Sequence, residues 1–148
     1  MTKASAAMPG RARHVFVYGT LLYPEVAAAV IGTSPAASRA RLDGFGRYQV
    51  RHAPFPGIAP ADSSVRGLVF EAIDAHALAR IDDFEDDMYR RTMVRVVREH
   101  DGEAIDAEAY VVRPRWRPAL RHRDWDRAAF ERDWLPAYSH TGRGRRSA

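Results

Sequence analysis

Two stretches of this 148-residue chain have residue types and spacing that could do chemistry, and the first is HVFVYGTLLYPE at residues 14–25. Strand-forming residues run into Tyr18-Gly19-Thr20, and a Pro-Glu helix start follows. A glycine at a strand end can adopt a positive φ and leave successive backbone N–H groups pointing one way, which makes an anion site. The helix N-terminus that follows adds partial positive charge. The turn is a candidate site for a carboxylate or a developing oxyanion, although most strand–Gly–turn sequences are only structural.

The second stretch is RIDDFEDDMYRR at residues 80–91, which carries Asp82, Asp83, Glu85, Asp86 and Asp87. Acidic residues at the end of a helix oppose its macrodipole, so the run is unusual. Helical spacing places Glu85 four residues after Ile81, on the flank of the apolar face. Glu85 is therefore the acid expected to be half-buried, where desolvation would raise its pKa towards that of a general base. The other acids fit a solvated helix end.

Other reactive residues form no convincing site. The chain has no cysteine, which excludes disulfides, thiol nucleophiles and cysteine-ligated metals. Its six histidines have no metal-ligand spacing, and no G-x-S-x-G motif supports a serine nucleophile. Tyr89 and Tyr110 occupy strand positions, where half-buried packing with a bonded hydroxyl is the usual role. We expect neither a metal nor a cofactor.

The composition, with 46% hydrophobic and 28% charged residues, fits one globular domain. No apolar run is long enough to span a bilayer, and residues 1–10 lack the apolar centre of a secretory signal. These features predict a cytoplasmic protein that does not contact a membrane.

The net charge of +4 is concentrated at the two ends of the chain. Residues 1–13 carry three basic residues and no acid, and residues 113–148 carry ten Arg and four acids, so the middle of the chain is mildly acidic. Because a nucleic-acid domain has its basic residues on folded elements with aromatics between them, we expect no nucleic-acid partner. We predict a domain at residues 14–138, a disordered segment at 1–13 and a basic disordered tail at 139–148.

Hydrophobic periodicity and breaker residues predict the elements that must position these groups. The first half of the chain is predicted to form a strand at 14–18, a short helix from Pro24 that ends at Gly32, extended chain at 39–50 broken at Asp43-Gly44, and a Pro-rich loop at 52–64. A strand at 65–73 follows, in which Gly67 marks a bulge or close packing, and then a helix capped by Asp74. The chain ends with a hairpin of 89–99 with 103–112 and a closing helix at 125–138. This order favours an α+β fold with a mixed or antiparallel sheet over regular βαβ alternation.

Six motifs in register resemble the γ-glutamylcyclotransferase-like family, also called the AIG2-like family. They are FVYGTL, FPGI, VRGLVFEAI, ALARIDDFE, MYRRTMVRVV and AEAYVV, which together cover about residues 14–113, with a looser likeness near 125–138. The resemblance implies a small mixed β-barrel with flanking helices. It implies substrate binding by the loop of Tyr18, Gly19, Thr20 and Leu21, and it places the catalytic glutamate at Glu85. Tyr89 and Tyr110 are further residues that could contact the substrate.

The reaction that the resemblance implies is an intramolecular cyclisation, assigned to transferase or lyase enzymes. The α-amino group of a γ-glutamyl compound attacks its own γ-carbonyl and gives 5-oxoproline and a free amine or amino acid, with Glu85 as base and acid. The alternative is a catalytically silent member that only binds a small ligand. The sequence indicates neither the leaving group nor the oligomeric state.

Overall fold

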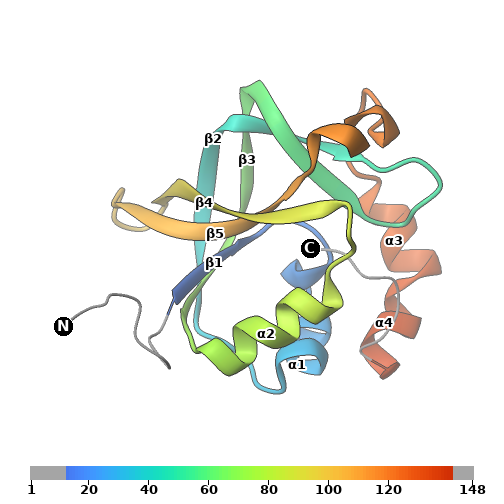
Figure 1. The fold of residues 1–148 in the computed structure, drawn as a ribbon. Helices are drawn as coiled ribbons and strands as arrows, with labels where there is room; N and C mark the ends of the chain where they lie inside the picture. The colour runs from blue at the N-terminus through green and yellow to red at the C-terminus, as the bar shows by residue number, and fades with distance from the viewer. Residues whose placement is uncertain (1–12, 142–148) are drawn as a thin grey trace.

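The computed structural model describes residues 13–141, with side chains described as far as residue 138 (Figure 1). In chain order the elements are β1 (Arg13–Val17), η1 (Thr20–Leu22), α1 (Pro24–Ile31), β2 (Ala37–Gln49), β3 (Pro56–Ile73), α2 (Ala75–Phe84), β4 (Tyr89–Arg98), β5 (Ala104–Val112), η2 (Pro114–Ala119), α3 (Arg127–Asp133) and α4 (Leu135–Thr141). Of the predicted terminal segments, Arg13 belongs to β1 and residues 139–141 continue α4. Residues 1–12 and 142–148 lie outside the described range.

The strands form a closed barrel in the order β1–β3–β2–β4–β5. Adjacent strands are antiparallel except β1 and β5, which pair in parallel at Val15 and Glu108. The parallel pair places the end of β1, where the candidate turn begins, beside β5. In Figure 1, α1 and α2 lie next to each other below the barrel, and α3 and α4 lie at its side. The prediction of a small mixed β-barrel with flanking helices is confirmed.

The helices near the site begin and end at the residues that the sequence indicated. Pro24 opens α1, and Gly32 closes it in a left-handed conformation with φ 93°. The side chain of Asp74 caps α2 by accepting a hydrogen bond of 2.8 Å from the N–H of Ala77. The buried face of α2 consists of Leu78, Ile81 and Phe84. This apolar face packs into the core and so fixes the position of the last turn of α2, just before Glu85.

The prediction of a loop over residues 52–64 is wrong from Pro56 onward, because β3 begins there and continues for 18 residues. The first part of β3 pairs with β2, whereas the pairing with β1 covers only residues 68–73. Proline lacks the N–H needed for a ladder hydrogen bond, so it is tolerated at strand starts and beside an unpaired edge. Pro56 opens the strand, and Pro60 pairs with Phe45 next to the irregularity in β2. Both prolines therefore fit a strand.

The predicted closing helix at 125–138 is two short helices, α3 and α4, which are separated at Trp134. Pro136 explains the break. In a continuous helix residue 136 would donate its N–H to the carbonyl of Arg132, but proline has no N–H and its ring would clash with that carbonyl. The apolar stripe is nevertheless buried at Phe130 and Tyr138, whereas the side chain of Trp134 is exposed.

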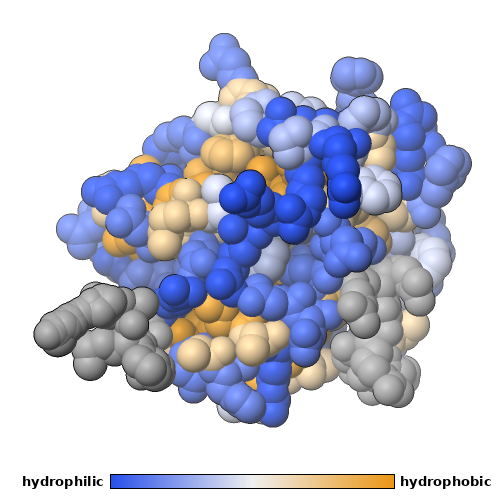
Figure 2. All heavy atoms as spheres, viewed as in Figure 1, coloured by the Kyte–Doolittle hydropathy of each residue, from blue (hydrophilic) through white to orange (hydrophobic). Residues whose placement is uncertain are grey.

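The surface seen in Figure 2 is mostly hydrophilic, with small apolar areas between the charged side chains. Within the part of the chain that the structure describes, no helix has the length and apolar character needed to cross a membrane.

Candidate functional site

The turn after β1 is the short 3₁₀ helix η1, and its backbone conformation differs from the anion-binding glycine turn that was predicted. Gly19 has φ −128° and ψ −126°, so the expectation of a positive φ is wrong. The N–H of Leu22 donates the first hydrogen bond of the turn to the carbonyl of Gly19, at 2.9 Å. The N–H of Leu21, one residue earlier in the turn, makes no hydrogen bond within the turn. The side chains of Thr20 and Leu21 are fully buried, so the turn is held by the core.

Tyr18, immediately before the turn, is fixed at two atoms. Its hydroxyl donates a buried hydrogen bond of 2.6 Å to the carbonyl of Tyr110 in β5. Its own carbonyl accepts a hydrogen bond of 2.9 Å from the guanidinium of Arg47 in β2. Burial, and then the negative charge of Glu85, raise the pKa of Tyr18 well above its usual value. The phenol therefore stays protonated and acts as a donor.

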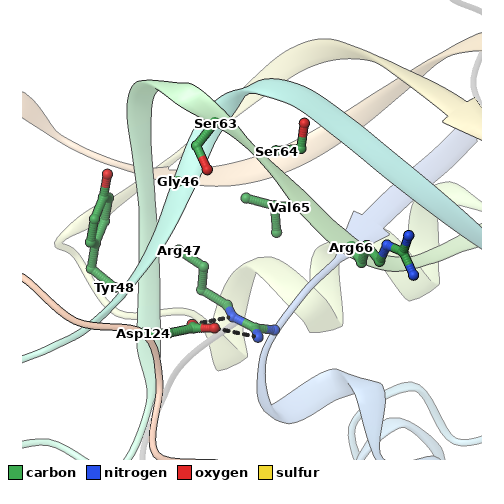
Figure 3. Close-up of a pocket in the computed structure, with 8 residues that line it drawn as sticks. All are labelled: Gly46, Arg47, Tyr48, Ser63, Ser64, Val65, Arg66 and Asp124. Carbon is green, nitrogen blue, oxygen red and sulfur yellow. Dashed lines mark hydrogen bonds and ion pairs between the residues drawn. The ribbon is translucent and has the colours of Figure 1, made fainter.

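Arg47 also lines a surface pocket of about 450 Å³ (Figure 3). Its guanidinium makes two hydrogen bonds to Asp124, at 2.8 and 3.1 Å. The pocket is lined by Gly46, Arg47, Tyr48, Ser63, Ser64, Val65, Arg66 and Asp124. Arg47 thus ties the carbonyl before the turn to the segment that leads into α3.

We expect Arg47→Met to lower the free energy of unfolding by about 1–3 kcal/mol, because it leaves the buried carbonyl of Tyr18 without this donor. Arg41→Met is the matched control, because Arg41 is also an arginine of β2 that pairs with an aspartate, Asp43. This pair is exposed, and exposed ion pairs contribute about 0–1 kcal/mol to the free energy of unfolding. Urea unfolding of both variants checks this. Equal losses in the two variants would contradict the structural role of Arg47.

Glu85 caps the C-terminal end of α2 in an extended conformation with φ −77° and ψ 147°. Its N–H donates to the carbonyls of Ile81 and Asp82, at 3.1 and 3.3 Å. Only 7% of the residue is exposed, and neither carboxylate oxygen has a hydrogen-bond partner among the described residues. Buried carboxylates are normally paired, so a group in this state is poised to receive a ligand or a proton.

The surroundings of Glu85 favour its protonated form. Burial, then the negative charges of Asp82 and Asp86, raise its pKa well above the usual range. The charge of Glu85 in turn contributes to the raised pKa of three buried tyrosines: Tyr18, which directly follows β1, Tyr89 in β4 and Tyr110 in β5. The carboxyl group therefore lies near phenols that line this end of the barrel.

The two tyrosines that were expected to be half-buried are buried, and their hydroxyls bind protein atoms. Tyr89 donates to the carbonyl of Pro56 at 2.6 Å, and Tyr110 donates to the carboxylate of Asp82 at 2.5 Å. The structure thus brings Tyr18, Tyr89, Tyr110 and Glu85 to one region, with the turn after Tyr18 next to it.

Sequence reasoning missed Asp82 and Arg47. Asp82 precedes Glu85 by three residues, a spacing that places two side chains on one side of a helix and could have singled it out of the acidic run. The contact between Arg47 and Tyr18 has no local signal, because it needs β2, β3 and β1 to assemble first.

Metal-binding groups do not gather in the described part of the chain, where no three His, Asp or Glu side chains are close enough to hold an ion.

Comparisons with known proteins identify the family of this chain. The sequence model of the family described as gamma-glutamyl cyclotransferase, AIG2-like, matches residues 15–127. Protein AIG2 C of Arabidopsis thaliana is 35% identical over 102 residues, which are 68% of this chain and 62% of that protein. The chain thus spans about three fifths of the length of that relative.

Solved structures share the fold. A solution structure from Arabidopsis thaliana has a TM-score of 0.70 at 27% identity and covers 82% of each chain. A crystal structure of an AIG2-like protein from Mus musculus has a TM-score of 0.60 at 25% identity and covers 78% of this chain and 88% of that one. The chain therefore belongs to the gamma-glutamyl cyclotransferase, AIG2-like family.

Proposed function

We propose that this protein is a γ-glutamyl cyclotransferase that converts a γ-glutamyl compound into 5-oxoproline and a free amine or amino acid, in the cytoplasm and without a cofactor. The observation that carries the proposal is Glu85, a buried carboxylate whose two oxygens have no hydrogen-bond partner among the described residues. The α-ammonium group of a γ-glutamyl substrate would supply the positive charge and the N–H donors that Glu85 lacks.

The chemical steps need one group that accepts a proton and later returns it. Glu85 takes a proton from the α-ammonium group, and the free amine attacks the γ-carbonyl carbon. A new C–N bond closes the five-membered ring, and the bond from the γ-carbon to the leaving nitrogen breaks. Glu85 passes its proton to that nitrogen, and the ring nitrogen gives up its second proton to the released amine, which leaves as an ammonium ion, so the products together contain the atoms and charge of the substrate. The raised pKa of Glu85 suits this role, because it makes the carboxylate a stronger base.

The turn of Gly19, Thr20 and Leu21 is proposed to hold the glutamyl end of the substrate. Its N–H groups would bind the α-carboxylate or stabilise the negative charge that develops on the γ-carbonyl oxygen. Nucleophile and electrophile belong to one molecule, so the protein has mainly to fold the substrate into a reactive conformation. Such orientation contributes up to roughly 7–11 kcal/mol in intramolecular reactions.

A panel of γ-glutamyl compounds tests the proposal. It should include γ-glutamyl amino acids, glutathione and a γ-glutamyl-lysine, with release of 5-oxoproline as the readout. We expect at least one compound to be turned over, with a rate that increases with pH as Glu85 ionises. Saturable binding by calorimetry without any turnover would instead support the alternative, a silent member of the family that only binds its ligand.

A further inference from the structure

Hydrogen bonds and ion pairs form a continuous chain from the end of α2, across β4 and β5, to the start of β1. Tyr110 donates to one oxygen of Asp82 at 2.5 Å, and Arg91 donates to the other at 2.5 Å. Arg91 also pairs with Glu108 at 2.8 Å, and Glu108 pairs with Arg13 at 3.0 Å. Alternating charges therefore connect the last turn of α2 to three strands of the barrel.

Strand register and burial hold this chain in one arrangement. Arg91 in β4 lies directly opposite Tyr110 in β5, so their side chains leave the same face of the sheet. Glu108, two residues before Tyr110 and on the same face, is 7% exposed. A buried charge is tolerated only when it is paired, so moving Arg91 would leave Glu108 with Arg13 as its single ion-pair partner among the described residues.

Tyr110 belongs to both halves of the site. Its backbone carbonyl accepts the hydroxyl of Tyr18, which precedes the turn. Its own hydroxyl holds Asp82, whose carbonyl accepts the N–H of Glu85. One residue thus sets the separation between the turn and the carboxylate.

We propose that Asp82 and Tyr110 are positioning residues for Glu85: they fix the end of α2 relative to Tyr18, and Asp82 places a negative charge beside the base. The inference rests on the proposed function for its catalytic consequence. Asp82 touches Tyr110 and Arg91 and acts on the reaction only through Glu85.

Electrostatics supports the role of Asp82. The groups that face Glu85 are Asp82 in α2, Asp86 just after α2, Tyr18 just after β1, Tyr89 in β4 and Tyr110 in β5. After burial itself, the charge of Asp82 is the largest cause of the raised pKa of Glu85. Removing that charge should lower the pKa of Glu85 and weaken it as a base.

Asp82→Asn tests the charge, with Asp83→Asn as the matched control. Asp83 is the next residue of α2, is exposed, and loses the same charge in its variant. We expect the acid limb of kcat/KM against pH to move about one unit lower in Asp82→Asn, because Glu85 then ionises at lower pH. Carboxyl NMR of Glu85 should show the same movement. Asp83→Asn should show neither change.

Tyr110→Phe tests the position separately, because it removes the bond to Asp82 but leaves the charge in place. We expect kcat to fall about tenfold, as for a misplaced base, with the acid limb close to that of the unmodified protein. This variant also covers the case in which Asp82→Asn does not fold, which circular dichroism reports.

The outcomes separate the inference from the function on which it rests. An acid limb and a Glu85 titration that are the same in Asp82→Asn and Asp83→Asn overturn the role of Asp82, while release of 5-oxoproline keeps the proposed function. A kcat in Tyr110→Phe equal to that of the unmodified protein overturns the role of Tyr110. If the unmodified protein releases no 5-oxoproline, the proposed function fails, and the NMR titration still decides whether Asp82 controls Glu85.

Discussion

Glu85→Gln is expected to lose turnover and, at neutral pH, to be more stable than the unmodified protein. Glutamine has the same shape but cannot accept a proton, and a positioned acid–base group contributes about 10²–10⁴-fold to a rate. The gain in stability follows from removing a buried carboxylate whose oxygens have no partner among the described residues. Glutamine is left without these partners too, but a neutral amide is less costly to bury than a charged carboxylate, so the gain is the difference between the two costs. A substitution that harms the reaction and helps the fold indicates a functional group.

The gain in stability depends on pH, and its sign follows from proton linkage. Burial, then Asp82 and Asp86, raise the folded-state pKa of Glu85 above its unfolded value, so the folded protein binds the proton more tightly. The stabilising contribution of Glu85 is complete below its unfolded pKa and is lost as the pH rises through the folded pKa. The free energy of unfolding of the unmodified protein should therefore fall relative to that of Glu85→Gln as the pH increases.

Urea unfolding between about pH 4 and pH 8 checks this sign. Glu25→Gln is the matched control, because it makes the same substitution at an exposed residue at the start of α1. A Glu85→Gln variant that becomes less stable than the unmodified protein as the pH rises would show that the carboxylate is compensated in the folded state.

Gly67→Ala is expected to give the largest loss of stability. A Cβ at this position would lie 2.1 Å from the carbonyl oxygen of Val17 and 3.0 Å from the ring of Phe16. Gly67 pairs with Ala40 in β2 without a register shift there, so it marks a close approach of two backbones and not a bulge. The carbonyl of Val17 cannot rotate away as a side chain would, so β1 would have to move.

The cost should exceed the roughly 1–3 kcal/mol of ordinary overpacking. Because Val17 immediately precedes Tyr18, the displacement should reach the turn and reduce turnover as well. Gly102→Ala is the control. Gly102 has open space around it but a φ of 68°, so the substitution should lower the free energy of unfolding by about 1 kcal/mol. Thermal unfolding and the yield of folded protein measure both variants. A smaller loss for Gly67→Ala than for Gly102→Ala would contradict the close approach at Val17.

Elements with a local signal were predictable from the sequence. Asp74 at the start of α2, Gly32 at the end of α1 and the turn before Gly102 each fix an element through their own backbone or side chain. The strand at Pro56 was missed because a proline is compatible with a strand only when one edge is unpaired, and that depends on how far β1 extends along β3. The break at Trp134 was missed because the apolar stripe continues across it.

The candidate site divides in the same way. Glu85 was identified because its place after the apolar face of α2 can be counted along the chain, although it proved to be buried and not half-buried. The conformation of Gly19 was not predicted, because the buried side chains of Thr20 and Leu21 draw the turn into a 3₁₀ helix. The bond from Tyr18 to Tyr110 depends on the parallel pairing of β1 with β5, which no short stretch of sequence encodes.

The most direct test of the central claim is 5-oxoproline release measured side by side for the unmodified protein and Glu85→Gln, both shown to be folded, on the best substrate of the γ-glutamyl panel. We predict turnover by the unmodified protein and a loss of about 10²-fold or more in the variant. Equal release of 5-oxoproline by both proteins would contradict the assignment of Glu85 as the base.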